Sequence, residues 1–287
     1  MEVIDSDIAA LVILFNPDDS VFDNLQSYNE RFERLYVIDN SEQSSESVLR
    51  AIKSLTNVRY FSNDGNQGIA NALNVGAAQA SKDGYEWVLT MDQDSSFEPK
   101  TLIKYLQCAS MFKNSPSIAI MAPNFLAGPV KTTSCLYSLR LTVIASGNLL
   151  NLAVYKILGG FNEALFIDEV DHDYCLRANR AGFTVVQFDD IALSHQIGAA
   201  VKFSFGSIRR SRTVHSPIRH YYIARNFLYI FFKYRREFPA YVYWRLLKVA
   251  RTLLFVLLFG PHKLERLKYI LVGMFHYSKS QMGRYRA

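Results

Sequence analysis

The sequence predicts an α/β fold: a mostly parallel, Rossmann-like sheet flanked by helices and followed by a basic, aromatic, helical C-terminal segment. Three observations predict it. Short β-rich apolar runs alternate with segments of helical period over residues 1–120, these runs are apolar almost without interruption, and the charge changes sign near residue 201. Near-continuous apolar strands with helical crossovers are typical of a parallel sheet covered on both faces. The chain has 287 residues, 49% of them hydrophobic, and can bury such a core.

The expected elements follow one another along the chain. Strands are expected over residues 8–16, 34–40, 58–62, 86–92 and 117–123. Helices are expected near residues 20–33, 44–55, 68–80 and 99–113. In the third helix Ile69, Leu73 and Ala77 recur at helical spacing. Farther on, two segments are strand-like, 140–151 and 184–195, and the segment 159–183 between them ends in a helix.

Charge divides the chain into two parts. Residues 1–201 hold 14 Lys and Arg against 24 Asp and Glu, whereas residues 202–287 hold 18 against 2. We therefore expect an acidic catalytic or binding body over 1–201 and a basic, aromatic helical region over 202–287 that meets an anionic partner. Lys248 and Arg251 lie beside large apolar residues, as in a helix that lies in a membrane interface. The alternative is helices packed on the body with their basic residues solvated.

Three features bear on the compartment. The N-terminal apolar run lacks the basic flank and small-residue cleavage site of a signal peptide, so we expect a cytosolic protein. The longest uncharged run of the basic region, residues 252–261, is far shorter than the ~20 residues that span a bilayer. The three cysteines, Cys108, Cys135 and Cys175, are odd in number and widely spaced, and we expect all three to be reduced thiols in the core.

Polar residues follow each of the first four predicted strands, where a parallel sheet binds its ligands. Asn16 follows the first strand, Asp39 the second, and Asn66 lies after the third. Asp92 and Asp94 follow the fourth, and residues i and i+2 of a strand point the same way. Two carboxylates with open positions for phosphates suit Mg²⁺ or Mn²⁺. The alternative is an acidic turn that caps the next helix.

A second acidic cluster lies at the start of a predicted helix. Four acids occur within six residues: Asp168, Glu169, Asp171 and Asp173. Some would only complement the helix dipole, but one carboxylate held near a substrate could act as a general base. Arg177 lies four residues after Asp173 and could pair with it along the helix.

Three further features suggest binding. His195, at the end of a strand-like run, is either structural or the third ligand of a metal set. Arg219 and Arg225 could clamp a diphosphate, or lie on a basic helix face. The helix that starts near Gly68 would present free N–H groups to an anion. The GxGxxG fingerprint is missing after the first strand, which disfavours a nicotinamide enzyme.

Taken in order over roughly residues 8–230, the segments resemble family 2 glycosyltransferases of the GT-A fold, inverting enzymes that use nucleotide-sugar donors. The matching segments are ILFN, VIDNS, GNQGIANALNVG, MDQDS, ASGNLL, GGFNEALFIDEVDHDYCLRA, SHQIG and RHYYIARN. Within that family, FIDEVDHDYCLR with HQIG and YYIARN is most similar to bacterial rhamnosyltransferases of surface-polysaccharide synthesis. The resemblance implies a dTDP-rhamnose donor, Mg²⁺ or Mn²⁺, and a glycan or lipid-linked acceptor at the inner face of the cell membrane.

The resemblance also implies roles for the matching residues. The nucleoside would be bound by Asn16, Asp39 and Asn66. The metal would be held by Asp94 and His195, with Asp92 and Arg225 at the diphosphate. Asp171 takes the position of the general base by its distance from Arg177, with Asp173 as the alternative.

Two other functions remain open at this point. One is a family 2 transferase that uses UDP-galactose or UDP-N-acetylglucosamine at the same site. The other is a nucleic-acid-binding protein whose basic C-terminal region carries base-stacking aromatics. The second does not explain the acidic crevice, which would repel a polyanion, and we expect no nucleic-acid partner.

Overall fold

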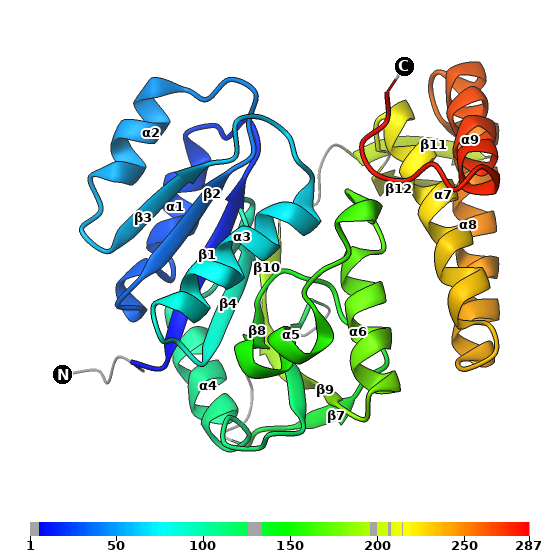
Figure 1. Cartoon of the computed structure of the whole chain (residues 1–287). Coiled ribbons are helices and arrows are strands. Elements are labelled where there is room, and N and C mark those ends of the chain that lie inside the picture. Colours follow the sequence, from blue (N-terminus) through cyan, green and yellow to red (C-terminus); the bar gives the residue numbers. More distant parts are fainter. Residues whose placement is uncertain (1–5, 126–133, 196–199, 206–207, 214, 287) are drawn as a thin grey trace. The chain divides into compact units, whose positions relative to one another are not determined.

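The computed structural model describes residues 6–125, 134–195, 200–205, 208–213 and 215–286. It divides into two compact units. The first comprises Met1–Phe166 and Val170–His195, and the second comprises Ile167–Glu169 and Gln196–Ala287. The first unit has helices around a central sheet, and the second is largely helical (Figure 1). The predicted α/β class with a helical C-terminal region is thereby confirmed.

The central sheet has eight strands among the described residues. They are β1 (Ile8–Leu14), β2 (Leu35–Asp39), β3 (Val58–Ser62), β4 (Trp87–Asp92), β6 (Ile118–Asn124), β7 (Tyr137–Leu139), β8 (Asn148–Asn151) and β9 (Thr184–Ala192). Their spatial order is β3-β2-β1-β4-β8-β6-β9-β7. Strand β1 runs parallel to β2 and β4, and β2 runs parallel to β3. Strand β6 runs parallel to β9, whereas β8 is antiparallel to its two neighbours, β4 and β6. The carboxyl ends of β1 to β4 and β6 therefore meet at one edge.

Helices cover both faces of this sheet. Side chains of β1 alternate between the faces, and Val12 and Leu14 pack in one cluster with three helices. These helices are α1 (Ser20–Gln26), α2 (Glu46–Lys53) and α4 (Pro99–Ser110). On the opposite face lies α3 (Ile69–Lys82), and a Cβ added to its Gly76 would approach the Leu11 side chain to 2.2 Å. Gly76 therefore lets this helix pack closely on β1.

The region after β6 differs from the prediction in one segment. The strand expected over 140–151 is confined to β8, and β7 ends before it at Leu139. Gly147 has φ 77°, and a Cβ there would lie 2.7 Å from Pro123. This bend interrupts the apolar run that suggested one continuous strand. The rest of the first unit contains η1 (Asn29–Arg31), α5 (Leu152–Leu158), η2 (Glu163–Leu165) and α6 (Val170–Arg180).

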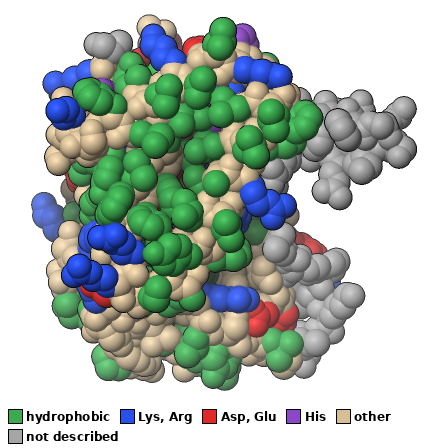
Figure 2. All heavy atoms as spheres, turned by 90° about the vertical axis from the view of Figure 1, so that its right-hand side faces the viewer, with side chains coloured by type: hydrophobic (Ala, Val, Ile, Leu, Met, Phe, Trp, Pro, Cys, Tyr) green, Lys and Arg blue, Asp and Glu red, His purple; other side chains and the backbone are tan. Residues whose placement is uncertain are grey.

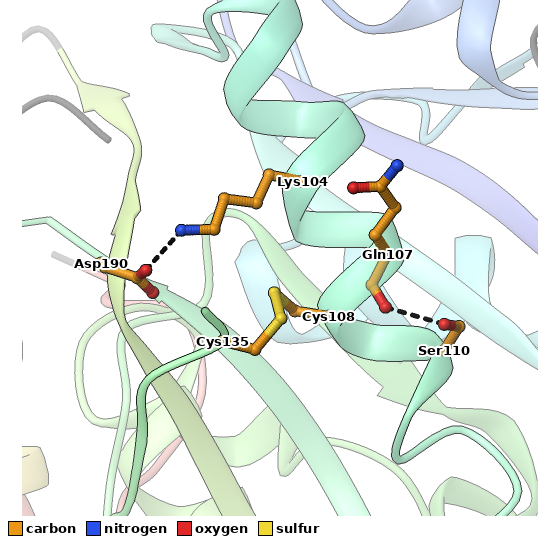
Figure 3. Close-up of a disulfide and its surroundings, with 6 residues drawn as sticks. All are labelled: Lys104, Gln107, Cys108, Ser110, Cys135 and Asp190. Atoms are coloured by element: carbon orange, nitrogen blue, oxygen red, sulfur yellow. Dashed lines mark hydrogen bonds and ion pairs between the residues drawn. A yellow bond between two sulfur atoms is a disulfide. The ribbon is translucent and has the colours of Figure 1, made fainter. Parts of the chain in front are cut away.

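Two cysteines are paired, which corrects the expectation of three reduced thiols. Cys108 on α4 forms a disulfide with Cys135, with a Cα–Cα distance of 5.5 Å (Figure 3). Lys104, one turn earlier on the same helix, forms an ion pair with Asp190 of β9. Cys175 is a buried free thiol, as expected. The sequence spacing could not reveal the pair, because it depends on how the chain returns to α4 after β6.

The second unit contains a pair of antiparallel strands that the sequence did not predict. Its strands are β11 (Ala200–Phe205) and β12 (Ile208–Thr213). Three helices follow: α7 (Pro217–Tyr234), α8 (Pro239–Phe259) and α9 (Lys263–Ser278). α7 and α9 approach closely, because a Cβ on Gly273 would lie 2.5 Å from the carbonyl oxygen of Tyr221. Within the described part of the chain, no helix is long and apolar enough to cross a membrane.

Candidate functional site

The carboxyl edge of the sheet brings the ends of β1 and β2 together. Asn16, two residues beyond β1, has φ 45° and donates its backbone N–H to Ser41 Oγ at 2.7 Å. The backbone N–H of Ser41 in turn donates to Asp39 Oδ1 at 2.9 Å. Asn16 and Asp39, two residues predicted to bind the nucleoside, are therefore linked through one serine. The sequence indicated both residues but not the serine between them.

Asp39 is a buried carboxylate held by several donors. Ser44 Oγ and the Tyr60 hydroxyl both donate to Oδ2, the latter at 2.8 Å, and Ser41 donates to Oδ1. Burial alone would raise the pKa of Asp39, but these hydrogen bonds outweigh it and hold the pKa below its ordinary value of 3.8. Asp39 thus carries a stable negative charge at the end of β2.

The Asp92-Gln93-Asp94 turn is braced against the end of β1. Gln93 Oε1 accepts from the Phe15 backbone N–H at 2.7 Å, and Gln93 Nε2 donates to the Phe15 carbonyl at 3.1 Å. On the other side, the Asp92 backbone N–H donates to Ser146 Oγ at 3.0 Å. The residue between the two acids is therefore structural, and its contacts place Asp92 and Asp94 at the same edge as Asn16.

His195 returns to this turn through a second, short pair of strands. β10 (Ser194–His195) is antiparallel to β5 (Ser95–Ser96), and His195 pairs with Ser95, the residue that follows Asp94. The backbone therefore brings the predicted metal ligands into neighbouring positions. The side chain of His195 lies outside the described residues. Among those that are described, no group of three potential ligand side chains was found.

The residues at this turn fit a hard divalent cation in their chemistry. Asp92 and Asp94 are partly exposed carboxylates, and oxygen donors are what Mg²⁺ and Mn²⁺ prefer. The buried Tyr28 hydroxyl lies close enough to feel the charge of Asp92, and it has no hydrogen-bond partner within the described part of the chain. Burial and the Asp92 charge both raise the pKa of Tyr28, so this hydroxyl stays neutral.

Amide side chains connect the ends of β2 and β3 to the start of α3. Asn40 Nδ2 donates to Asn66 Oδ1 at 3.2 Å, and Asn40 Oδ1 accepts from Asn63 Nδ2 at 3.0 Å and from the Gln67 backbone N–H at 3.0 Å. Asn66 Oδ1 also accepts from the Gly68 backbone N–H at 3.0 Å. Asn66 is thus brought to the same edge as Asp39. Asn40 is the centre of this network, a role that its position after β2 did not reveal.

The start of α3 is covered by protein, which corrects the expectation of an open anion site there. The Ile69 backbone N–H donates to the Phe166 carbonyl at 2.8 Å. Gly68 has φ 89°, and a Cβ on it would lie 2.6 Å from Phe166. A glycine is therefore required at this contact, and it lets the segment that leads to the second acidic cluster pack on α3.

The two carboxylates that could act as the general base, Asp171 and Asp173, lie in different environments. Asp173 has no exposed surface, and its Oδ2 accepts from Arg177 Nε at 2.9 Å, as the sequence spacing predicted. Asp171 is only partly buried, and its Oδ1 accepts from the backbone N–H of His172 at 2.8 Å. Because α6 precedes β9, which runs parallel to β6, the N-terminus of α6 faces the carboxyl edge of the sheet. This arrangement favours Asp171 as the base.

The other two acids of the cluster belong to the second unit. Asp168 pairs with Arg219 at 3.1 Å, and Glu169, which is 6% exposed, pairs with Arg245. Both acids have positive φ, 65° and 62°. The buried Asn226 side chain holds this strained stretch by donating to the Asp168 carbonyl at 3.0 Å. Arg219 is therefore engaged with a carboxylate, and its part in a diphosphate clamp stays a prediction.

Arg225 also lies in the second unit. Its side chain is fully buried and stacks on the Tyr221 ring, 5.0 Å from the ring centroid. Nη1 donates to the Tyr221 hydroxyl at 3.1 Å and to the Gly283 carbonyl at 2.7 Å. These contacts support a structural role, in which Arg225 holds the C-terminal segment against α7. Its assignment to the diphosphate stays a prediction.

Comparison with known proteins gives this edge of the sheet a chemical context. Residues 19–121 match the family model "Glycosyl transferase family 2". That range contains Asp39, Asn66 and the Asp92–Asp94 turn. The chain is 27% identical over 246 residues to dTDP-rhamnosyl transferase RfbF of Shigella flexneri, and the match covers 77% of this chain and 78% of the relative.

Solved structures share the fold at low identity. Residues 1–349 of S. aureus TarS in complex with UDP-GlcNAc align with a TM-score of 0.59 and 16% identity over 96% of this chain and 81% of that one. GalNAc-T7 with UDP, GalNAc and Mn²⁺ aligns with a TM-score of 0.55 and 12% identity, over 66% of this chain but only 44% of that one. These comparisons agree: the chain has the GT-A fold, and its residues 19–121 match the family 2 glycosyltransferases.

Proposed function

We propose that this protein transfers rhamnose from dTDP-rhamnose to a hydroxyl group of a glycan or lipid-linked acceptor in cell-surface polysaccharide synthesis. One observation carries the proposal: the Asp92–Asp94 turn and the start of α6 lie at the carboxyl edge of one sheet, in a chain similar to a dTDP-rhamnosyl transferase. We place the reaction in the cytoplasm, with the protein held peripherally at the inner face of the cell membrane.

The chemistry is a single displacement. The Asp171 carboxylate takes the proton of the acceptor hydroxyl, whose oxygen attacks the anomeric carbon on the face opposite the departing nucleoside diphosphate. The configuration at that carbon inverts. Asp173 does not compete for this proton, because it is buried against Arg177.

The remaining residues bind the donor. We assign the nucleoside to Asn16, Asp39 and Asn66, and the diphosphate side of the site to Asp92. Asp94 and His195 would hold Mg²⁺ or Mn²⁺, which when bound neutralises the charge that grows on the diphosphate. Gln93 keeps the turn fixed against Phe15, so that these groups are in place before the donor arrives.

A donor screen tests the proposal. Release of nucleoside diphosphate would be measured with dTDP-rhamnose, UDP-galactose, UDP-N-acetylglucosamine and a GDP-sugar, each with Mg²⁺, with Mn²⁺ and with EDTA. We expect release from dTDP-rhamnose that EDTA abolishes. Turnover of UDP-sugars alone would reject the rhamnosyl donor and retain the transferase. Turnover that resists EDTA would reject the metal, and no turnover with any donor would reject the proposed activity.

A further inference from the structure

Helix α8 is apolar on two different sides. Its buried side is a narrow stripe of valines seven residues apart: Val242, Val249 and Val256. A second stripe is exposed, with residues three, four or seven apart. Its members are Trp244 (56% exposed), Leu247 (65%), Leu254 (57%) and Leu258 (52%). Residues at this spacing share one helix face, so the second unit buries one apolar side of α8 and leaves the other in contact with solvent.

Helix α9 also leaves an apolar face exposed. Its buried residues are Arg266, Ile270 and Gly273. Its exposed apolar residues are Leu264, Leu267, Leu271, Met274 and Phe275, of which Leu264 is 84% exposed. We call the exposed apolar residues of α8 and α9 the α8–α9 surface. Figure 2 shows this side of the molecule, where hydrophobic side chains gather over a broad area and Lys and Arg side chains lie among and around them. A patch of this kind marks an interaction site.

The charge around the α8–α9 surface is almost entirely positive. The 21-residue helix α8 contains no Asp or Glu, and its Lys248 and Arg251 are exposed. Lys248 Nζ lies 5.1 Å from the centroid of the Trp244 ring, so a basic and an interfacial aromatic residue lie side by side. On α9 the exposed Lys268 adds to this charge, and the acidic residue there is Glu265.

The combination of apolar and basic side chains on the α8–α9 surface decides which of three partners fits it. A second copy of the chain would bring two strongly basic surfaces face to face, and like charges repel. A nucleic acid would accept the cations but would offer no apolar medium to the exposed leucines. A bilayer with anionic lipids offers both, because its headgroups attract Lys and Arg while its acyl boundary takes up Leu, Phe and Trp.

We propose that the α8–α9 surface docks the protein on an anionic lipid membrane, with both helices lying in the interface. Leu254, Leu258 and Leu264 would enter the acyl boundary, and Lys248 and Arg251 would remain among the headgroups. The proposal deepens the proposed function and rests on it for its purpose, since such a membrane presents lipid-linked acceptors. It requires no spanning helix.

The two tryptophans allow a direct test. Trp87 is 1% exposed inside the sheet, whereas Trp244 lies on the proposed surface. The full-length protein would be mixed with vesicles of phosphatidylglycerol and phosphatidylcholine, or of phosphatidylcholine alone, with brominated acyl chains. We expect quenching of Trp244 fluorescence only with the anionic vesicles, and weaker binding as salt increases.

Matched variants locate the contact. Leu254→Glu and Leu258→Glu should each weaken binding to anionic vesicles about tenfold or more, because each removes a leucine from the apolar boundary. Ile157→Glu is the control, since Ile157 is 70% exposed on α5 of the first unit and should have no effect. Lys248→Gln should weaken binding about fivefold at low salt. Circular dichroism would verify that each variant is folded.

The outcomes separate this inference from the proposed function. No binding to anionic vesicles, or equal loss in the Ile157→Glu control, would overturn it. It would also be overturned if the wild-type protein formed a dimer but bound no vesicles, and the leucine variants abolished that dimer. Nucleoside diphosphate release from a soluble donor is measured without vesicles, so a protein that turns over donor but does not bind vesicles would refute the membrane surface alone. A protein that binds vesicles but turns over no donor would refute the transferase proposal alone.

Discussion

Replacing Asp173 by asparagine should destabilise the first unit, whereas the same replacement at Asp171 should remove transfer and leave stability nearly unchanged. Asp173 is fully buried and paired with Arg177. The Arg177 guanidinium also donates to the carbonyl oxygens of Leu158 at 2.7 Å and Gly160 at 2.5 Å. The ion pair therefore holds α6 to the end of α5, and its loss should lower the stability of the first unit.

The size of the effect follows from burial. Removing one partner of a buried ion pair costs about 3–5 kcal/mol, because the other charge is left uncompensated. Asparagine keeps a hydrogen-bond acceptor, and the Arg177 side chain is 14% exposed. We therefore expect Asp173→Asn to lower the free energy of unfolding by about 3 kcal/mol, the lower end of this range. In a domain of this size, about 2–4 °C is lost per kcal/mol, so the melting temperature should fall by roughly 6–12 °C. At the partly exposed Asp171 we expect a change within about 0.5 kcal/mol.

Two assays check this pair of variants. Thermal and urea denaturation give the stability of each, and nucleoside diphosphate release from dTDP-rhamnose in the presence of acceptor gives the activity at a temperature where both are folded. We expect Asp171→Asn to lose about 100-fold or more in transfer while it still binds the donor. An Asp173→Asn variant that melts like the wild type but is inactive, beside an active Asp171→Asn variant, would show that the two roles are reversed.

Three further predictions concern other residues. The pKa of Asp39 in the folded protein is below its ordinary value of 3.8, so the stability that its carboxylate contributes is present above pH 3.8 and is lost as pH falls through the folded pKa. The loss of stability at acidic pH should therefore be less steep in Asp39→Asn. A loss as steep as that of the wild type would contradict this prediction. Gly68→Ala should destabilise by more than about 1 kcal/mol in denaturant titration, because of the positive φ and the contact with Phe166, and equal stability would exclude that contact. Thiol titration of the denatured, unreduced protein should find one group, Cys175, and three after reduction; three groups before reduction would mean that the disulfide does not form.

The sheet and the polar residues at its edge could be predicted because local patterns determine them. The apolar runs of β1, β2 and β4 specify buried parallel strands, and in such a sheet the residues that follow the strands lie at the ligand-binding edge. Asn16, Asp39, Asn66 and the Asp92–Asp94 turn were found in this way.

The parts that could not be predicted depend on contacts between distant segments. In the sequence nothing distinguishes Gln93 from any polar residue between two acids. Its structural role depends on two hydrogen bonds to the backbone of Phe15, which follows β1. Arg225 and Arg219 read as anion-binding residues, but their partners, Gly283 and Asp168, lie 58 and 51 residues away in the sequence. A basic residue in a sequence shows its charge, and the fold alone shows which group neutralises or buries it.

The configuration of the transferred sugar tests the single displacement by Asp171 most directly. The anomeric carbon of the rhamnosyl product would be compared with that of the donor by NMR, from the one-bond carbon–proton coupling. We predict an inverted configuration, because the acceptor oxygen attacks from the face opposite the departing diphosphate. A product that retains the configuration of the donor would contradict the mechanism, because retention requires a different course of reaction at the anomeric carbon.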